Sequence, residues 1–201
     1  IRPFSKICSK KRISPEPATK GNPLVRHSVQ ASKEIALTLP QIFFDRVIHF
    51  GCKTALLSKD PLSKKYEPIP WDAWGSWVKQ TAGALRDLGV KAQDRIGLLS
   101  ENRPEWTYVD LGALSLRAVL VPIYPTSSLQ DVAHILENAG IEVLFLSSRA
   151  QWERLQPVLS PRSKLKVIIF DPASCPGTLS FQDFISKACA VPTAAFDSLL
   201  K

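Results

Sequence analysis

Short apolar runs alternate with amphipathic stretches along the second half of the chain. The apolar runs begin at Arg95, Ala118, Glu142 and Leu165, so their starting points lie 23, 24 and 23 residues apart. Each gap places apolar residues at spacings of three and four, which is typical of a helix with one buried face. Strands that are apolar throughout and alternate with helices indicate βαβ crossovers. We therefore predict an α/β fold: a parallel sheet of βαβ units with helices on both faces.

The helices between these strands carry recognisable boundary signals. In the first gap Asn102 is the expected N-cap, followed by Pro104 and Glu105 in the first turn. The second helix opens with Ser127 and Gln130 at capping-box spacing and ends at Gly140. The third helix is expected to begin near Ser148 and to end at Pro157, and a last helix runs from Ser180 to about Ala188.

The first half of the chain predicts fewer elements. A helix capped by Thr38, with Pro40 in its first turn, is expected to bury a stripe and to stop at Gly51; the stripe comprises Leu39, Ile42, Phe43, Val47 and Phe50. Residues 54–58 predict a short strand, and residues 59–70 a surface connection rich in lysine and proline. Residues 71–88 form a strongly periodic helix whose apolar face we assign to the core.

Positive charge is concentrated at the start of the chain. The first 35 residues, called the leader below, hold eight lysines or arginines against two glutamates and so carry +6 of the formal net charge of +8. We predict two parts: a basic, irregular leader at 1–35 and one α/β domain at 36–201. An organellar transit peptide or a membrane-surface anchor is the alternative interpretation of the leader. Since the remainder is nearly neutral, we expect no nucleic acid partner.

Several kinds of chemistry lack support in the sequence. The four cysteines and three histidines are scattered, without the spacing of a metal site, and no metal-ligating set is predicted. The sequence contains no glycine-rich nucleotide loop of either common type and no nucleophile elbow. Glu101, Glu105 and Asp110 are interpreted as helix-terminal or surface charges rather than as acid–base groups.

Two passages remain distinctive. The first runs from Leu88 to Trp106 and ends in Asn102-Arg103-Pro104-Glu105-Trp106; the second is Ala118-Val119-Leu120-Val121-Pro122-Ile123-Tyr124-Pro125-Thr126-Ser127. Together, in this order and at this distance, they resemble the adenylate-forming superfamily, most closely the N-terminal part of long-chain fatty acyl-CoA synthetases. The family-motif scaffold is Asn102, Pro104, Glu105, Trp106, Pro122, Tyr124, Pro125 and Thr126. Two positions depart from the family pattern, since Gln93 and Arg117 stand where glycine is usual.

The resemblance implies a two-step ligase. In such enzymes a fatty acid carboxylate attacks the α-phosphate of ATP with Mg²⁺, releasing pyrophosphate, and the thiol of coenzyme A then displaces AMP from the acyl-adenylate. The family's Ser/Thr/Gly-rich phosphate loop is not found up to Lys201, so we expect an incomplete N-terminal part of the large adenylation domain. Catalytic residues are expected beyond Lys201, and the chain alone is expected to be inactive.

Other interpretations differ in class. One is a non-catalytic α/β binding module that uses its basic leader; another is a ligase that acts on a different carboxylic acid or on acyl carrier protein. No long apolar run or secretory signal is found, which predicts a cytoplasmic location, with peripheral membrane contact as a further expectation. Neither the acyl chain length nor the oligomeric state follows from the sequence.

Overall fold

The computed structural model describes residues 37–60, 63–172 and 175–186. The predicted leader lies outside these residues, as does the expected end of the last helix at Ala188. The elements, in chain order, are α1 (Leu39–Phe50), β1 (Thr54–Lys59), β2 (Tyr66–Pro70), α2 (Trp71–Asp87), β3 (Arg95–Leu99), α3 (Pro104–Ser115), β4 (Val119–Ile123), α4 (Leu129–Asn138), β5 (Val143–Leu146), α5 (Arg149–Leu159), β6 (Lys166–Ile169), β7 (Thr178–Ser180) and α6 (Phe181–Ser186).

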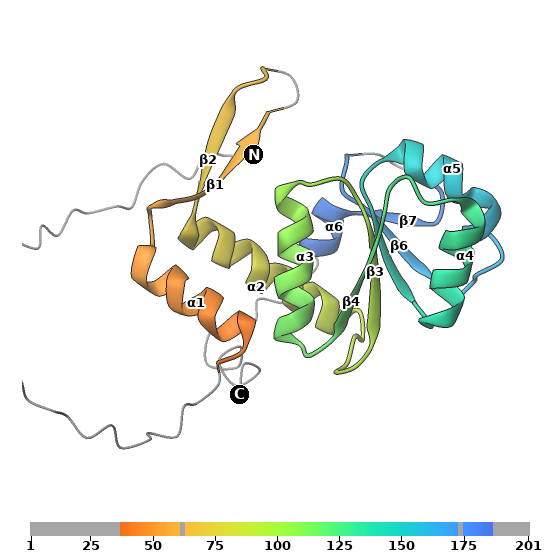
Figure 1. The fold of residues 1–201 in the computed structure, drawn as a ribbon, viewed down its shortest axis with the longest axis horizontal. Coiled ribbons are helices and arrows are strands. Elements are labelled where there is room, and N and C mark those ends of the chain that lie inside the picture. The colour runs from red at the N-terminus through yellow and green to blue at the C-terminus, as the bar shows by residue number, and fades with distance from the viewer. Residues whose placement is uncertain (1–36, 61–62, 173–174, 187–201) are drawn as a thin grey trace, which may run out of the picture. The chain divides into compact units, whose positions relative to one another are not determined.

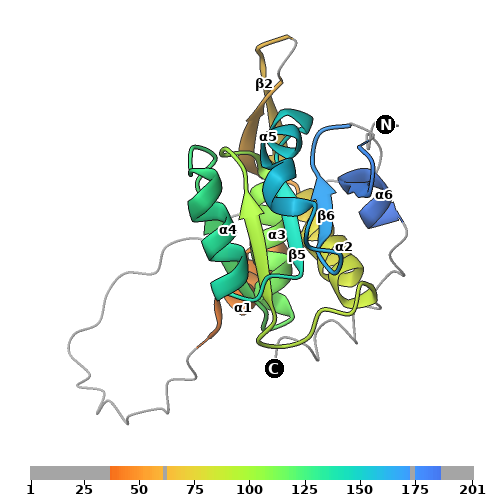
Figure 2. The ribbon, with the colours of Figure 1, turned by 90° about the vertical axis from the view of Figure 1, so that its right-hand side faces the viewer.

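A five-stranded parallel sheet forms the centre of the described chain, in the order β4-β3-β5-β6-β7 (Figures 1 and 2). The four predicted strands are all present, each starting within one residue of its expected position. The short strand β7 was not predicted, because its three residues carry only one large apolar side chain, Leu179. The α/β fold with a parallel sheet is confirmed.

Helices cover both faces of this sheet, and each face has its own core. On one face α1, α2, α3 and α6 pack in a cluster that includes Leu98, Phe145 and Ile168 of the sheet. On the other face α4 and α5 pack in a second cluster with Leu99 and Leu144. Figure 1 shows α3 and α4 on opposite sides of the strands. Successive strand residues point to opposite faces, so strands that are apolar throughout can supply both cores.

Helix α1 begins and ends as predicted but buries a different stripe. Thr38 and Gln41 form a capping box, and Gly51 follows the last helical residue. Leu39 and Ile42 were expected in the core but are exposed, because Pro40, Phe43 and Phe44 occupy the buried face. The ring of Phe43 lies 4.8 Å from that of Trp74 on α2, so aromatic packing rather than the aliphatic residues sets the orientation of the helix.

The segment predicted as a surface connection contains a strand. β1 and β2 form an antiparallel hairpin in which Leu57 faces Pro68 and Lys59 faces Tyr66. β2 (Tyr66–Pro70) was not predicted because two of its five residues are prolines, which lack an N–H for pairing. Such a strand is tolerated where its ladder is short and one edge stays unpaired.

Three predicted helix boundaries were wrong by a few residues. The N-cap of α3 is Arg103 rather than Asn102, since the residue before Pro104 must be extended. The capping box of α4 is formed by Ser128 and Asp131 rather than by Ser127 and Gln130, because the N–H of Ser127 closes a turn onto Tyr124.

Helix α5 begins after Ser148 as predicted, but it does not end at Pro157. It continues to Leu159 with Pro157 inside it. Pro157 and Glu153 are exposed, so water can reach the carbonyl of Glu153 that the missing N–H would have bonded.

Candidate functional site

The carboxyl ends of β3, β4, β5 and β6 meet along one border of the sheet, called the carboxyl edge below. The chain leaves β3 through α3 on one face and leaves the neighbouring β5 through α5 on the other. This divergence between adjacent parallel strands is the place where open α/β sheets bind ligands. The first family motif follows β3 and the second ends β4, so both reach this edge.

Arg103 connects three strands at the carboxyl edge. Its Nε donates to Oε2 of Glu105 at 2.9 Å, and its Nη1 donates to Oδ1 of Asp171 at 2.8 Å. The same Nη1 also donates to the carbonyl of Ser147 at 3.2 Å, and the guanidinium lies 5.2 Å from the ring centre of Phe170. These contacts join the ends of β3, β5 and β6, which are separated by up to 68 residues in the sequence.

Neighbouring carboxylates favour the protonated form of the Arg103 guanidinium. Burial alone would lower the pKa of Arg103, but hydrogen bonds and charges from Glu105 and Asp171 raise it above its ordinary value. The Arg103 side chain is about a quarter exposed, so its two ion pairs are screened less than pairs in open water. Arg103 therefore cross-links the strand ends and is not a free cation in this structure.

Glu101 stands at the same divergence point, between β3 and α5. Partial burial raises the pKa of its carboxyl, but hydrogen bonds from its own backbone, Ser147 and Gln151, with the charge of Arg103, lower it overall. Glu101 is thus ionised over the physiological pH range and held by protein groups. The crevice where a ligand would be expected is bordered here by side chains that already bind one another.

Arg154 fixes the loop that carries the second motif. From α5 its Nη2 donates to the carbonyl of Pro125 at 3.0 Å and its Nη1 to that of Ser127 at 2.8 Å. Its Nε donates to Oε1 of Gln151 at 3.0 Å. The loop after β4 is consequently held against α5, and it presents Tyr124 to solvent with 80% of that residue exposed.

The predicted scaffold residues divide between packing and the surface. Pro104 and Glu105 begin α3, while Trp106 packs against the larger core. Asn102, Pro122, Tyr124 and Thr126 are exposed, and the carbonyl of Pro125 binds Arg154.

Pro122 fits β4 because of the strand's register. Val119 directs its N–H towards β3, onto the carbonyl of Asp94, so alternate residues, including Pro122, face the unpaired side.

Sequence reasoning did not single out the residues that organise this edge. Arg103 was quoted only as part of a motif, and Ser147, Arg154 and Asp171 received no role. One signal could have found three of them: Arg103, Ser147 and Asp171 each follow a predicted apolar strand within a few residues. Parallel strands bring such positions together at one edge, whatever their separation along the chain.

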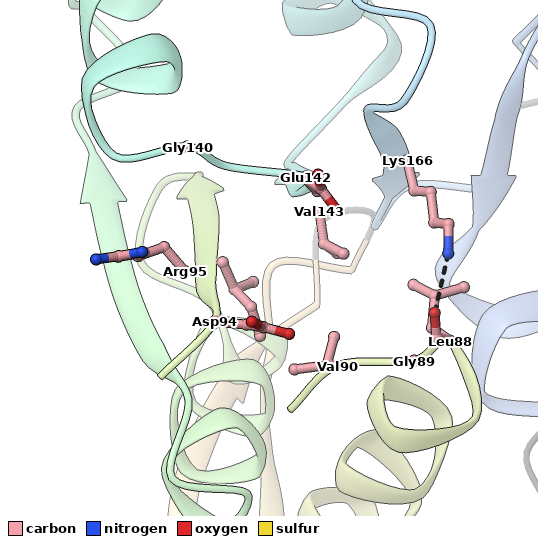
Figure 3. Close-up of a pocket in the computed structure, with 10 residues that line it drawn as sticks. Leu88, Gly89, Val90, Asp94, Arg95, Gly140, Glu142, Val143 and Lys166 are labelled. Atoms are coloured by element: carbon pink, nitrogen blue, oxygen red, sulfur yellow. Dashed lines mark hydrogen bonds between the residues drawn. The ribbon is translucent and has the colours of Figure 1, made fainter. Parts of the chain in front are cut away.

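The opposite border of the sheet holds a cavity of about 240 Å³, lined by residues that follow α2 and α4 and by the starts of β3, β5 and β6 (Figure 3). Figure 3 shows Lys166 reaching the carbonyl of Leu88, to which its Nζ donates at 2.9 Å. The carboxylate of Asp94 accepts the N–H of Lys91 at 2.8 Å. These two charged groups therefore serve to close a helix end and a turn. The start of the first family passage, from Leu88 to Ile96, lines this cavity, but the scaffold residues of both motifs do not.

Neither a metal-binding cluster nor a membrane-spanning helix occurs in the described part of the chain. Within residues 37–60, 63–172 and 175–186, no group of three or more histidine, cysteine or acidic side chains could hold a metal ion. The acids at the carboxyl edge are bound by Arg103 or by neighbouring donors, so the described residues do not form a fitting site for Mg²⁺. Over the same ranges no helix is long and apolar enough to cross a membrane.

Comparison with known proteins agrees with this architecture. The family model described as AMP-binding enzyme matches residues 44–195. The long-chain-fatty-acid–CoA ligase ACSBG2 of Rattus norvegicus is 27% identical over 177 residues, which cover 83% of this chain and 26% of the relative. The human ACSBG2 is 30% identical over 134 residues, covering 66% of this chain and 20% of that protein. The chain thus spans about a quarter or less of the length of these curated relatives.

Solved structures share the fold. The anthranilate CoA ligase AuaEII, in complex with anthranoyl-AMP, superposes with a TM-score of 0.68 at 21% identity, covering 76% of this chain and 28% of that one. At this identity the similarity concerns the fold alone. Because the family model covers most of the chain, these 201 residues belong to the AMP-binding enzyme family.

Proposed function

We propose that this chain serves as part of the large domain of an AMP-forming long-chain fatty acid–CoA ligase. The relatives named for long-chain fatty acids support this choice among acid–CoA ligases. The complete reaction would convert ATP, fatty acid and coenzyme A to acyl-CoA, AMP and pyrophosphate. When bound, Mg²⁺ and ATP would supply an activated phosphate for attack by the carboxylate.

The role of these residues in that reaction is structural. The observation that carries the proposal is the state of the carboxyl edge, where Arg103 and Arg154 bind protein carboxylates and carbonyls. These side chains orient the loops of both motifs, and the donors they use are no longer available for a phosphate. We therefore assign no catalytic step to a described residue, and we expect the 201-residue chain to be inactive by itself.

Acid and acceptor specificity follow from the same proposal. A long-chain fatty acid is the expected acid and coenzyme A the expected acceptor; another carboxylic acid, or an acyl carrier protein, is the alternative. We also propose a cytoplasmic location with contact to a membrane surface, since long-chain acids partition into bilayers.

Pyrophosphate exchange into ATP tests the proposal. The purified chain and the longer polypeptide obtained by extending its reading frame past Lys201 would be assayed with Mg²⁺ and palmitate, with benzoate as the control acid. We expect exchange only with the longer polypeptide and preferentially with palmitate. Exchange by the 201-residue chain would contradict the structural role, and no exchange with any acid by the longer polypeptide would contradict the ligase.

A further inference from the structure

The β1–β2 hairpin presents an unusual outer face. Side chains alternate along each strand, and Leu57 pairs with Pro68 while Lys59 pairs with Tyr66, so these four residues share one face. All four are exposed, Leu57 and Tyr66 by 63% each. The other face, with Leu56 and Ile69, is only partly exposed. The hairpin therefore turns apolar side chains towards solvent on the face that the fold leaves uncovered.

Positive charge accompanies this face. The Nζ of Lys59 lies 5.9 Å from the ring centre of Tyr66, and Lys64 and Lys65 follow at the exposed turn. Of the two acids in the hairpin, Asp60 accepts the N–H of Ser63 within the turn. Glu67 pairs with Ser58, so its side chain stands on the opposite face. One cation, Lys59, thus lies on the outer face, and two more, Lys64 and Lys65, lie at the turn that closes the hairpin.

We propose that the outer face of the hairpin binds an anionic lipid surface, together with the lysines of its turn. The outer face comprises Leu57, Lys59, Tyr66 and Pro68, and the turn adds Lys64 and Lys65. An aliphatic and an aromatic side chain can enter the boundary between headgroups and acyl chains, with the tyrosine hydroxyl remaining at the headgroups. Lysines beside them keep their ammonium groups among lipid phosphates while their stems lie along the apolar surface.

Lipid fits this face better than other acidic partners. A nucleic acid would use the cations and an aromatic platform but would gain nothing from exposed leucine and proline. The proposal names a surface for the membrane contact suggested above, and it does not depend on the ligase activity or on the basic leader.

Binding to vesicles tests the proposal with the full 201-residue chain. The chain would be co-sedimented with vesicles of phosphatidylcholine mixed with phosphatidylserine, and with vesicles of phosphatidylcholine alone. Replacing both apolar residues, Leu57→Ser with Tyr66→Ser, is expected to weaken binding to the anionic vesicles by about tenfold or more. The matched control is Val119→Ser with Tyr124→Ser, which removes an exposed aliphatic and an exposed aromatic residue from β4 and its loop and should leave binding unchanged.

A second variant tests the charges separately. Lys59→Glu with Lys65→Glu should weaken binding to anionic vesicles by about tenfold or more, while binding to phosphatidylcholine alone should not fall. Circular dichroism of each variant confirms that it is folded before its binding is compared.

Four results would overturn the proposal. The first is that the parent chain does not bind anionic vesicles, and the second is that the Leu57 and Tyr66 replacements leave binding intact, which would assign binding to the leader. The third is that the two apolar double variants lose binding equally. The fourth is that only the lysine replacements weaken binding, which would indicate a purely acidic partner. Each outcome is independent of pyrophosphate exchange.

Discussion

The two borders of the parallel sheet are built in different ways. At the carboxyl edge, long side chains join loops that are far apart in the sequence: Arg103 reaches Asp171, and Arg154 reaches the carbonyl of Pro125. At the amino edge, backbone hydrogen bonds close the turns, as between the N–H of Gln93 and the carbonyl of Arg117 at 2.9 Å. The carboxyl edge therefore relies on two arginine side chains, while the amino edge combines the side-chain bonds of Lys166 and Asp94 with turns that depend on backbone conformation.

Strain is concentrated on the amino side. Gln93 and Arg117 have φ angles of +71° and +58°, in the left-handed region that favours glycine. The family resemblance gives glycine at both positions, so the structure explains the family preference. This chain tolerates two strained residues at the amino edge and has two arginine cross-links at the carboxyl edge.

Loss of the Arg103 cross-link should have the largest effect. Arg103→Ala leaves Glu105, Asp171 and the carbonyl of Ser147 without their shared donor, and it should destabilise the fold by about 2 kcal/mol. Urea unfolding measures this difference. The matched control is Arg149→Ala, whose ion pair with Glu153 is more than half exposed and should contribute much less to stability because solvent screens it. Equal losses in the two variants would remove the distinction between cross-link and surface pair.

Loss of the Arg154 clamp should have a smaller and more local effect. Arg154→Ala removes two hydrogen bonds to the loop after β4 and should destabilise the fold by about 1–1.5 kcal/mol. The amide of Ser127, which bonds the carbonyl of Tyr124, should exchange its hydrogen faster. Arg154→Lys keeps the charge and should retain part of the protection. Unchanged exchange at Ser127 in the alanine variant would show that the clamp does not hold the loop.

A substitution at the amino edge should stabilise the fold rather than destabilise it. Arg117→Gly relieves the left-handed strain and should stabilise the fold by about 0.5–1 kcal/mol, net of the added freedom of glycine when unfolded. Arg117→Ala keeps a side chain at the same φ and should give no comparable gain. Thermal unfolding of the two variants checks this, and a loss of stability in the glycine variant would contradict the assignment of strain.

Replacement of Asp110, a half-buried acid on α3, should have the smallest effect on stability, and this effect should depend on pH. Burial raises the pKa of Asp110 above its ordinary value, so the folded state holds a proton more tightly than the unfolded state. Ionisation of Asp110 therefore destabilises the fold increasingly as the pH rises from the ordinary pKa to the raised one, and fully above it. Asp110→Asn should stabilise the protein at neutral pH and lose that advantage as the pH falls below about 4. A gain of the same size at both pH values would contradict this cause.

Much of the sheet could be predicted from sequence because its signals are local. Each strand from β3 to β6 is an apolar run long enough to form a buried strand, and the helices between these strands have an apolar face. The hairpin could not be predicted in the same way. Its second strand is defined by pairing with β1, and Pro68 and Pro70 remove the usual signal.

The candidate site was only partly accessible to sequence reasoning. The motifs after β3 and β4 lie at the carboxyl edge, where strand order also predicts a ligand site. Positions after the predicted strands could have placed Arg103, Ser147 and Asp171 at one edge, but not their hydrogen bonds, since Ser147 and Asp171 lie 44 and 68 residues away from Arg103. The predicted N-cap was wrong by one residue where two candidates were adjacent, as at Ser127 and Ser128. Tertiary contacts decide which of the two hydroxyls caps the helix.

A double-mutant cycle between Arg103 and Asp171 tests most directly whether side chains cross-link the carboxyl edge. Arg103→Ala, Asp171→Ala and the double variant would be compared with the parent by urea unfolding. If the pair joins β3 to β6 as described, the double variant should be less destabilised than the sum of the single variants, with a coupling of about 1 kcal/mol. Additivity within about 0.3 kcal/mol would contradict the cross-link and, with it, the distinction between the two edges.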